Sequence, residues 1–269
     1  MSLFITLEGP EGSGKTTQCQ RLEQHLSGKG YDVLRTREPG GTPIGQQVRG
    51  VLLDQNNCAM TPEAEFLLFS ASRAQLVREV IRPHLEKGGV VVCDRFFDSS
   101  IAYQGYGHRL ERKVLREATR LATGGLQPDL TLLLDIPPEE GLRRRKQQSE
   151  QWNRLDAYEL SFHARVRQGF LTLAQAEPRR WEVIDASQTS DTLFEEDTPL
   201  VITNADGEER VETFAGEPRF VVQFNDFSEC VLTGKAPEFP PEDGLANTAA
   251  VLALYASASS GQITAVERV

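Results

Sequence analysis

Residues 3–17 read LFITLEGPEGSGKTT, and this stretch decides which fold the chain can adopt. The apolar residues 3–7 predict a buried strand, and residues 9–16 fit the phosphate-loop pattern G-x-x-x-x-G-K-[ST]. Glycines let backbone N–H groups close around nucleotide phosphates, and the helix that follows directs its positive dipole end at them. Lys15 suits the outer phosphates and the Thr16 hydroxyl suits Mg²⁺. A glycine-rich turn can match the pattern by chance, but the flanking strand and helix favour a nucleotide-binding loop.

Strand and helix patterns alternate after this loop. Strand-like runs cover residues 3–7, 31–36, 90–93, 130–134 and 181–184. Helical patterns cover residues 15–26, 44–53, 62–85, 111–121, 138–148 and 158–176. The alternation predicts an α/β fold, with a five-stranded parallel sheet, helices on both faces and right-handed crossovers. Ligands of such sheets bind at the carboxyl ends of the strands.

Composition limits the domain organisation and the partners. The chain has 269 residues, of which 39% are hydrophobic, enough for one large domain or two small ones. Its net charge is −10, yet residues 1–192 carry equal numbers of acidic and basic side chains, so the whole excess lies in residues 193–269. This asymmetry indicates a boundary near Leu193 and argues against nucleic-acid binding by the acidic tail.

Cysteine and histidine spacing indicates the compartment. The four cysteines and four histidines are scattered, which predicts reduced thiols rather than disulfides or a metal site. The chain starts directly with a strand pattern, so we expect no signal peptide, and no apolar run has the length of a membrane span. We therefore expect a cytoplasmic protein without a membrane partner.

Chemically informative residues follow the second and third predicted strands. Residues 37–42 read REPGGT, which is either a plain Pro-Gly turn or a tight turn that places Glu38 near a phosphate. Arg49 on the next helix can reach an anion. Asp94 ends an apolar strand, where a carboxylate needs a cation such as Mg²⁺, and Arg95 beside it can fork onto a phosphate. A structural Asp94–Arg95 pair is the alternative.

Two further segments can contribute to a nucleotide site. Phe69 and Arg73 are four residues apart, so they share one helix face, where Phe69 can stack on a base or simply pack in the core. Residues 141–167 are rich in basic side chains, a pattern that usually marks a solvated helix face. However, the phosphate loop has no arginine between Pro10 and Ser13, and phosphoryl transfer needs positive charge on the moving group. A basic flap over the site would meet that need.

Taken together, these segments resemble the bacterial thymidylate kinase family of nucleoside monophosphate kinases. The motifs that carry the resemblance are FITLEG (4–9) with GKTT (14–17), TREPGGT (36–42), FSASRAQ (69–75), DRF (94–96) with AYQG (102–105), and NRLD (153–156). They occur in the family's order over residues 1–192. The resemblance implies a P-loop nucleoside monophosphate kinase fold for a domain at residues 1–196, with a lid at about 141–156.

The resemblance also implies an activity: transfer of the γ-phosphate of ATP to dTMP, giving dTDP for dTTP synthesis, with Mg²⁺ and in a homodimer. Its catalytic residues would be Lys15, Arg95 and Arg154, and its metal ligands Thr16 and Asp94. ATP would be bound by Gly9, Pro10, Glu11, Gly12, Ser13, Gly14, Lys15, Thr16, Thr17 and Arg143. The dTMP would be bound by Glu11, Glu38, Pro39, Arg49, Phe69, Arg73, Arg95, Ser100, Tyr103 and Gln104.

Particular roles follow from the family's motifs. Phe69 should stack on thymine, Arg73 should bond its carbonyl edge, and the ring of Tyr103 should disfavour a 2′-hydroxyl. Arg49 and Arg95 should grip the acceptor phosphate. The peptide bond before Pro39 should be cis.

The lid departs from the family at one position. Asn153 stands where the family has an aspartate, which puts the local pairing of the lid in doubt. Arg154 is the first choice for the catalytic lid arginine, with Arg143, Arg144 and Arg145 as the other candidates.

The tail departs from the family, whose chain usually ends in one more helix. Residues 191–196 begin such a helix, and Pro199 breaks it. From there the chain resembles the C-terminal end of a glucose–fructose oxidoreductase-type dehydrogenase, with a strand at 219–224 and helices at 226–232 and 244–257. No G-x-G-x-x-G occurs, so we expect no NAD binding. Residues 197–269 are then a small α+β or poorly ordered extension, either a packing or dimer-contact remnant or an accidental join of two reading frames.

Two other functions stay open. A P-loop regulator that signals to a partner would need neither a base-stacking Phe69 nor an arginine lid. A kinase of another nucleoside monophosphate would differ only at a few pocket positions.

Overall fold

The computed structural model describes residues 2–147, 152–187, 199–203 and 209–213. The chain divides into two compact units, residues 1–193 and 194–269, and each is treated by itself. In the first unit, five parallel strands form one sheet in the order β2-β3-β1-β4-β5. The strands are β1 (Leu3–Glu8), β2 (Val33–Arg37), β3 (Val90–Asp94), β4 (Leu130–Asp135) and β5 (Trp181–Asp185). The predicted fold class is therefore confirmed.

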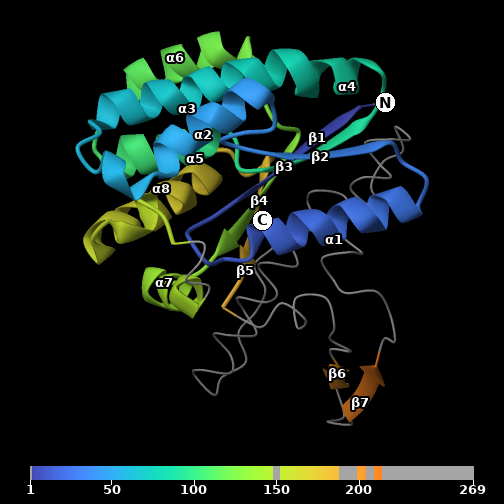
Figure 1. Cartoon of the computed structure of the whole chain (residues 1–269). Helices are drawn as coiled ribbons and strands as arrows, with labels where there is room; N and C mark the ends of the chain where they lie inside the picture. The colour runs from blue at the N-terminus through green and yellow to red at the C-terminus, as the bar shows by residue number, and fades with distance from the viewer. Residues whose placement is uncertain (1, 148–151, 188–198, 204–208, 214–269) are drawn as a thin grey trace. The chain divides into compact units, whose positions relative to one another are not determined.

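Helices cover both faces of this sheet (Figure 1). Helix α1 (Lys15–Gly28) contacts β1, β2 and β3, and in Figure 1 it lies below the sheet, whereas α3, α4 and α6 lie above it. The other α-helices of the described residues are α2 (Pro43–Leu53), α3 (Pro62–Leu76), α4 (Arg82–Glu86), α5 (Phe97–Ser100), α6 (Arg112–Thr123), α7 (Pro138–Gln147) and α8 (Leu160–Ala176). Short 3-10 turns stand at Gln55–Asn57 and Leu155–Ala157.

The central strands are apolar because both of their faces are covered, as expected for a parallel sheet. Every residue of β1 is buried, and Phe4 packs edge-to-face on Phe96 with ring centroids 5.0 Å apart. On the side of α8, Tyr103 packs against the rings of Phe162 and Phe170. These contacts fix the segment after β3 against the sheet, and several predicted site residues lie on that segment.

The helix predicted at 62–85 is interrupted. α3 passes into a π-helical segment, Val77–Ile81, before α4 begins. Pro83 explains the widening, since it lacks an N–H and its ring would clash with the carbonyl group one turn earlier. The sequence patterns also missed α5 and the π-helical segment that continues it, Ile101–Gly107.

The second unit is described only at two strands. β6 (Pro199–Thr203) and β7 (Glu209–Thr213) pair antiparallel, with Pro199 opposite Thr213. Neither strand was predicted. The elements predicted at 219–224, 226–232 and 244–257, and the start of a helix at 191–196, lie outside the described residues.

Candidate active site

The phosphate loop stands between β1 and α1, as its sequence predicts. Gly14 takes a left-handed conformation, with φ of 90°, and caps α1. The ammonium of Lys15 folds back on the loop, where it donates hydrogen bonds to Pro10 O at 2.7 Å and to Ser13 Oγ at 3.1 Å. Burial lowers the pKa of Lys15 to about 8, and the positive charge of Arg95 adds to this effect. These two bonds hold the Lys15 ammonium within the loop.

Thr16 and Asp94 form a pair of hard oxygen donors beside this loop. The Thr16 hydroxyl donates to Asp94 Oδ2 at 2.6 Å, although the two residues come from α1 and the end of β3. Both line a cavity of about 520 Å³, together with Arg37, Gly41 and other residues of the β2–α2 connection. A hydroxyl beside a carboxylate suits Mg²⁺, which takes few protein oxygens and completes its shell with water and phosphate.

Arg95 connects the phosphate loop to the segment after β3. Its Nη1 donates to Gly9 O and to Ser99 Oγ, each at 3.0 Å. Its Nη2 donates to Glu11 Oε2 at 3.2 Å and to the Tyr103 hydroxyl at 3.1 Å. The residue holds a φ of 69°, which is uncommon for a residue other than glycine and is kept only where many contacts support it.

Glu11 completes this cluster. The Tyr103 hydroxyl donates to Glu11 Oε1 at 2.7 Å. Burial by itself would raise the pKa of Glu11, but Arg95 and Lys15 outweigh burial and hold it at about 2. Glu11 is therefore an anion, and it fixes both the guanidinium of Arg95 and the ring of Tyr103.

Glu8 supports this arrangement, and the sequence analysis did not select it. Its Oε1 accepts hydrogen bonds from Phe96 N at 2.8 Å and Ser99 N at 3.3 Å, and its Oε2 accepts one from Ser99 Oγ at 2.6 Å. The carboxyl is fully buried, and burial raises its pKa to about 7. An acidic residue at the end of an apolar strand was the signal that picked out Asp94, and the same signal applies to Glu8.

Arg73 and Glu38 form a buried ion pair. Arg73 is 1% exposed and reaches Glu38 Oε2 at 2.7 Å through Nη2, which also donates to Ser100 Oγ at 3.0 Å. Among the described residues, Arg73 Nη1 and Glu38 Oε1 have no hydrogen-bond partner. Burial raises the pKa of Glu38 to about 7. Unpaired buried polar atoms are costly, so this pair has hydrogen-bonding capacity left for a ligand.

The Glu38–Pro39 peptide bond is cis, as predicted. The cis turn is held by Arg49, whose Nη1 donates to Pro39 O at 3.1 Å. Burial lowers the pKa of Arg49 to about 10, and the positive charges of Arg37 and Arg145 add to this. The arginine predicted to bind an acceptor phosphate is thus surrounded by other cations, a setting that attracts an anion.

Phe69 lies about one turn before Arg73 on α3, and Gln104 lies about one turn after Ser100, which bonds Arg73. Phe69 is half-buried, whereas Phe66 on the same helix is a core residue. Gln104 Nε2 donates to Glu65 Oε1 at 2.7 Å, and Gln104 Oε1 lacks a partner among the described residues. Of the two phenylalanines, Phe66 is thus the one that packs in the core, and half-buried Phe69 keeps a surface for stacking on a base.

Arg154, the first choice for the catalytic lid arginine, is held in a buried hydrogen-bond network. It is buried, and its three nitrogens donate to Leu52 O at 3.0 Å, to the Tyr158 hydroxyl at 2.7 Å and to Glu65 Oε2 at 2.5 Å. The His108 imidazole, 3.3 Å away, together with hydrogen bonds from Arg154 and Gln104, outweighs burial and lowers the pKa of Glu65 to about 2. Glu65, which sequence reasoning missed, thus anchors Arg154 to α3.

The basic residues of α7 have varied partners. Arg143 is mostly exposed and bonds Glu140 at 2.8 Å, one turn earlier. Arg144 donates to Ala186 O at 2.8 Å. Arg145 Nε lies 3.2 Å from both oxygens of Asp156, which also accepts from Asn153 N at 2.8 Å.

One of the α7 arginines is related electrostatically to the predicted acceptor side. Burial lowers the pKa of Arg49, and the positive charge of Arg145 adds to this effect, so Arg145 lies within electrostatic range of the predicted acceptor-phosphate arginine. Asn153 replaces the family's aspartate, but Asp156 still pairs with a lid arginine.

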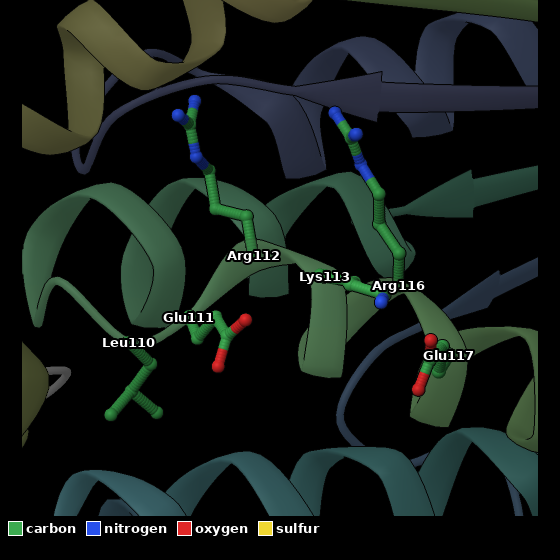
Figure 2. Close-up of a pocket in the computed structure, with 6 residues that line it drawn as sticks. All are labelled: Leu110, Glu111, Arg112, Lys113, Arg116 and Glu117. Atoms are coloured by element: carbon green, nitrogen blue, oxygen red, sulfur yellow. The ribbon is translucent and has the colours of Figure 1, made fainter.

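A second pocket lies away from this cluster, at the start of α6. Figure 2 shows the lining residues, with Arg112 and Arg116 extending to the same side; they are Leu110, Glu111, Arg112, Lys113, Arg116 and Glu117. Arg112 Nη1 donates to the Tyr106 hydroxyl at 2.7 Å. None of the predicted site residues lines this pocket. Among the described residues, no helix is long and apolar enough to cross a membrane, and no group of three or more His, Cys, Asp or Glu could hold a metal ion.

The parallel sheet, the phosphate loop at its carboxyl edge and the arginines around that loop define a P-loop nucleoside monophosphate kinase. The family described as "Thymidylate kinase" matches residues 7–196. The chain belongs to the thymidylate kinase family.

Relatives and a solved structure agree with this assignment. The chain is 50% identical over 220 residues to thymidylate kinase of Herpetosiphon aurantiacus, covering 73% of this chain and 93% of the relative. It is 57% identical over 191 residues to thymidylate kinase of Deinococcus radiodurans, covering 71% and 92%. The crystal structure of thymidylate kinase from Ehrlichia chaffeensis superposes with a TM-score of 0.57 at 35% identity, covering 68% of this chain and 92% of that one.

Proposed function

We propose that the chain transfers the γ-phosphate of ATP to dTMP, giving dTDP and ADP. The observation that carries the proposal is the position of Arg95. Its guanidinium bonds the phosphate loop at Gly9 O and Glu11 and, on the other side, the hydroxyl of Tyr103. A single cation thus stands where a donor phosphate on the loop and an acceptor phosphate beside it would meet.

ATP would occupy the phosphate loop, residues 9–17, with Lys15 near its outer phosphates and Arg143 approaching from α7. Thr16 and Asp94 would hold Mg²⁺, which neutralises phosphate charge when it is bound. The 2.6 Å contact between their oxygens supports this assignment, since it places two hard donors together beside the loop. Arg154 and the α7 arginines Arg143, Arg144 and Arg145 remain the candidates for the catalytic lid arginine, and the buried bond of Arg154 to Glu65 favours a role for Arg154 as an anchor of the lid.

The monophosphate would lie between Arg95 and α3. Phe69 would stack on the base, and Arg73 would offer its unpaired Nη1 to a carbonyl oxygen of the base. Arg49 and Arg95 would bind the phosphate. Glu38 and Pro39 would form the turn beside it, while Glu11, Ser100, Tyr103 and Gln104 would surround the sugar and the rest of the base.

The chemistry that these groups can perform is alignment and charge neutralisation. The acceptor is already an anionic phosphate, so no general base is required. The guanidinium of Arg95 is held by Ser99, Glu11 and Gly9, and such a preformed cation needs little reorganisation when charge moves to the transferred group. Closure of residues 141–156 over the site would exclude water and limit ATP hydrolysis.

A coupled assay of ADP formation with dTMP, dUMP, dCMP and dGMP tests the substrate. A pocket that fits the thymine methyl should favour dTMP over dUMP about tenfold or more in kcat/KM. Equal turnover of all four monophosphates, or turnover of none, would contradict the assignment. ATP binding without turnover would instead favour a P-loop regulator.

Arg95→Ala tests the acceptor site. We expect kcat/KM for dTMP to fall by about two orders of magnitude or more, as for loss of a transition-state contact. Arg78→Ala, an exposed arginine of the π-helical segment after α3, serves as the control. A loss of less than threefold, about 0.7 kcal/mol, would remove Arg95 from the phosphate site.

We further propose a homodimer through α2, α3 and α6. Most of the large apolar residues that are exposed in the described chain lie on these helices: Ile44, Val51, Leu67, Val114 and Leu121. The three helices lie side by side (Figure 1), and α3 contacts both others. Leu121 is 84% exposed. Packing of a second copy of the chain against this surface would bury its side chain.

Light scattering tests the dimer. The protein should have twice the mass of its chain, and Leu67→Glu should halve it. Val183→Glu, at an exposed residue of β5, should leave the mass unchanged. A monomeric mass for the unmodified protein at tens of micromolar would refute this interface.

For domain organisation, we propose a kinase domain at residues 1–196 and an extension at 197–269. The division of the chain into units at residue 193 supports this boundary. The extension keeps its resemblance to an oxidoreductase fragment as a hypothesis, tested by the intact mass of the protein from its native source.

A further inference from the structure

Two glycines far apart in the sequence bring the phosphate loop and α7 into direct backbone contact. A Cβ at Gly12 would stand 2.0 Å from the carbonyl oxygen of Gly141. A Cβ at Gly141 would stand 2.1 Å from the carbonyl oxygen of Glu11. Neither position has room for a methyl group, and the obstructing atoms belong to the backbone, which cannot rotate away as a side chain can.

The loop touches the same connection at a second point. A Cβ at Gly9 would stand 2.4 Å from the carbonyl oxygen of Leu134, near the end of β4. The segment from Leu134 to Gly141 therefore lies along the loop from Gly9 to Gly12. Figure 1 shows α7 at the carboxyl end of β4, on the side where α1 starts.

Gly141 has no conformational reason to be glycine. It lies in the first turn of α7, and its N–H donates to Pro137 O at 3.0 Å in a helical bond. Its φ lies outside the left-handed region, which Gly12 does occupy with a φ of 71°. In a helix, glycine is about 0.5–1 kcal/mol less stable than alanine. The close contact with the loop is therefore the physical reason for glycine at this position.

The position of α7 matters because of what it carries. Arg143, Arg144 and Arg145 follow Gly141 within about one turn of helix. Arg145 bonds Asp156 and influences Arg49. A shift of α7 away from the loop would move these guanidinium groups together, because a short helix moves as a unit.

We propose that Gly141 is a positioning residue: the absence of its side chain sets the separation between the phosphate loop and α7, and so places the α7 arginines relative to the nucleotide phosphates. This proposal rests on the proposed kinase function only for its kinetic consequence. The contact itself follows from the short distances between Gly12 and the backbone of Gly141 and between Gly141 and the backbone of Glu11.

Gly141→Ala tests the proposal, with Gly28→Ala as the control. Gly28 is at the end of α1, and nothing lies within 4 Å of its added Cβ. Helix propensity alone would make both variants slightly more stable. Relief of the contact at Gly141 needs a displacement on the order of 1 Å, and a misplacement of that size can cost about 100-fold in rate.

We expect Gly28→Ala to keep its kinetic constants and to keep or slightly raise the melting temperature. Gly141→Ala should melt at a lower temperature, and its kcat should fall at least about tenfold while KM for dTMP stays within about threefold. A merely structural role would lower stability without changing kcat at a temperature where the variant is fully folded. A higher melting temperature with unchanged kcat would overturn the proposal.

Hydrogen exchange of the unmodified protein gives a second test that does not depend on the folding of the variant. Addition of Mg·ADP should slow exchange in residues 9–16 and also in residues 138–142. Protection of the loop without any change in 138–142 would overturn the coupling. Failure of the proposed kinase function would appear differently, as an unmodified protein that turns over no nucleoside monophosphate.

Discussion

Replacement of Arg154 by methionine distinguishes an anchoring arginine from a catalytic one. Methionine keeps much of the length and apolar bulk of the side chain but removes the charge. In the structure, Arg154 neutralises Glu65, whose side chain is 0% exposed, and it also bonds Tyr158 and Leu52 O. Arg154→Met therefore leaves a carboxylate buried without its main cation.

The pKa of Glu65 indicates how much stability its hydrogen-bond partners contribute. Burial raises that pKa, but the nearby His108 and the hydrogen bonds from Arg154 and Gln104 bring it from 4.5 to about 2. At about 1.4 kcal/mol per pKa unit, these interactions contribute on the order of 3 kcal/mol. Because the folded-state pKa is depressed, this stability is present above pH 4.5 and is lost as the pH falls toward 2.

Loss of one partner of a buried ion pair typically costs about 3–5 kcal/mol. We expect Arg154→Met to lose about 3 kcal/mol of unfolding free energy, which lowers the melting temperature of a domain of this size by roughly 6–12 °C. Thermal and urea denaturation at pH 8 measure the loss. The matched control is Arg143→Met, an exposed arginine paired one turn away, for which we expect less than about 0.5 kcal/mol.

A pH series and a double variant sharpen the test. Without Arg154, burial should raise the pKa of Glu65 in the folded state, so the deficit of Arg154→Met should shrink as the pH falls from 8 to 5. Arg154→Met in a Glu65→Gln background should cost less than in the unmodified protein. If Arg154→Met keeps its stability and loses only kcat, Arg154 is a catalytic lid arginine and the anchoring argument is wrong.

Three further predictions follow from other contacts. Burial raises the pKa of Glu8 to about 7, so the protein should lose stability as the pH rises from about 4.5 to 7. Burial raises the pKa of Glu38 in the same way, so Glu8→Gln should weaken this dependence without abolishing it, and identical melting curves against pH for both proteins would contradict the prediction. Tyr103→Phe removes the hydrogen bonds that the hydroxyl makes with Glu11 and Arg95. The unfolding free energy measured in urea should therefore fall by about 1–3 kcal/mol. No change would mean that water bonds the hydroxyl in the unfolded chain as well as these partners do in the folded protein. Deletion of residues 197–269 should leave the affinity for ADP, measured by calorimetry, within about twofold of the full chain. Every proposed site residue lies before residue 197. Loss of binding by a folded truncated protein would show that the extension contributes to the pocket.

The dominant elements of the fold could be read from local patterns. The run at 3–7 and the glycine loop after it are short-range features, and a strand, turn and helix at those positions follow from residue type alone. The patterns missed α5 and the π-helical segment after it, because Phe97 to Gly107 has neither helical nor strand periodicity. Its backbone is held by distant partners, among them the Glu8 carboxylate that bonds Phe96 N and Ser99 N.

Candidate site residues could be predicted where they belong to a local sequence motif. They could not be predicted where their role depends on a bonding partner from another helix or strand. Arg95 and Asp94 end a strand beside the phosphate loop, so the topology of a parallel sheet already brought them there. Glu65 looks like any acidic residue at the start of an exposed helix. Only the fold shows that it is buried and bonded by Arg154, some 90 positions away in the chain.

The sequence by itself determined the strand–loop–helix unit, the parallel α/β class and the candidates for phosphate-binding side chains, because each depends on neighbours a few residues apart. The tertiary structure alone decided that Arg154 is anchored, that Arg145 lies near Arg49 and that Gly141 touches the loop at Gly12. Contacts of this kind join residues from separate elements, and their energies depend on burial and distance, which no local pattern records.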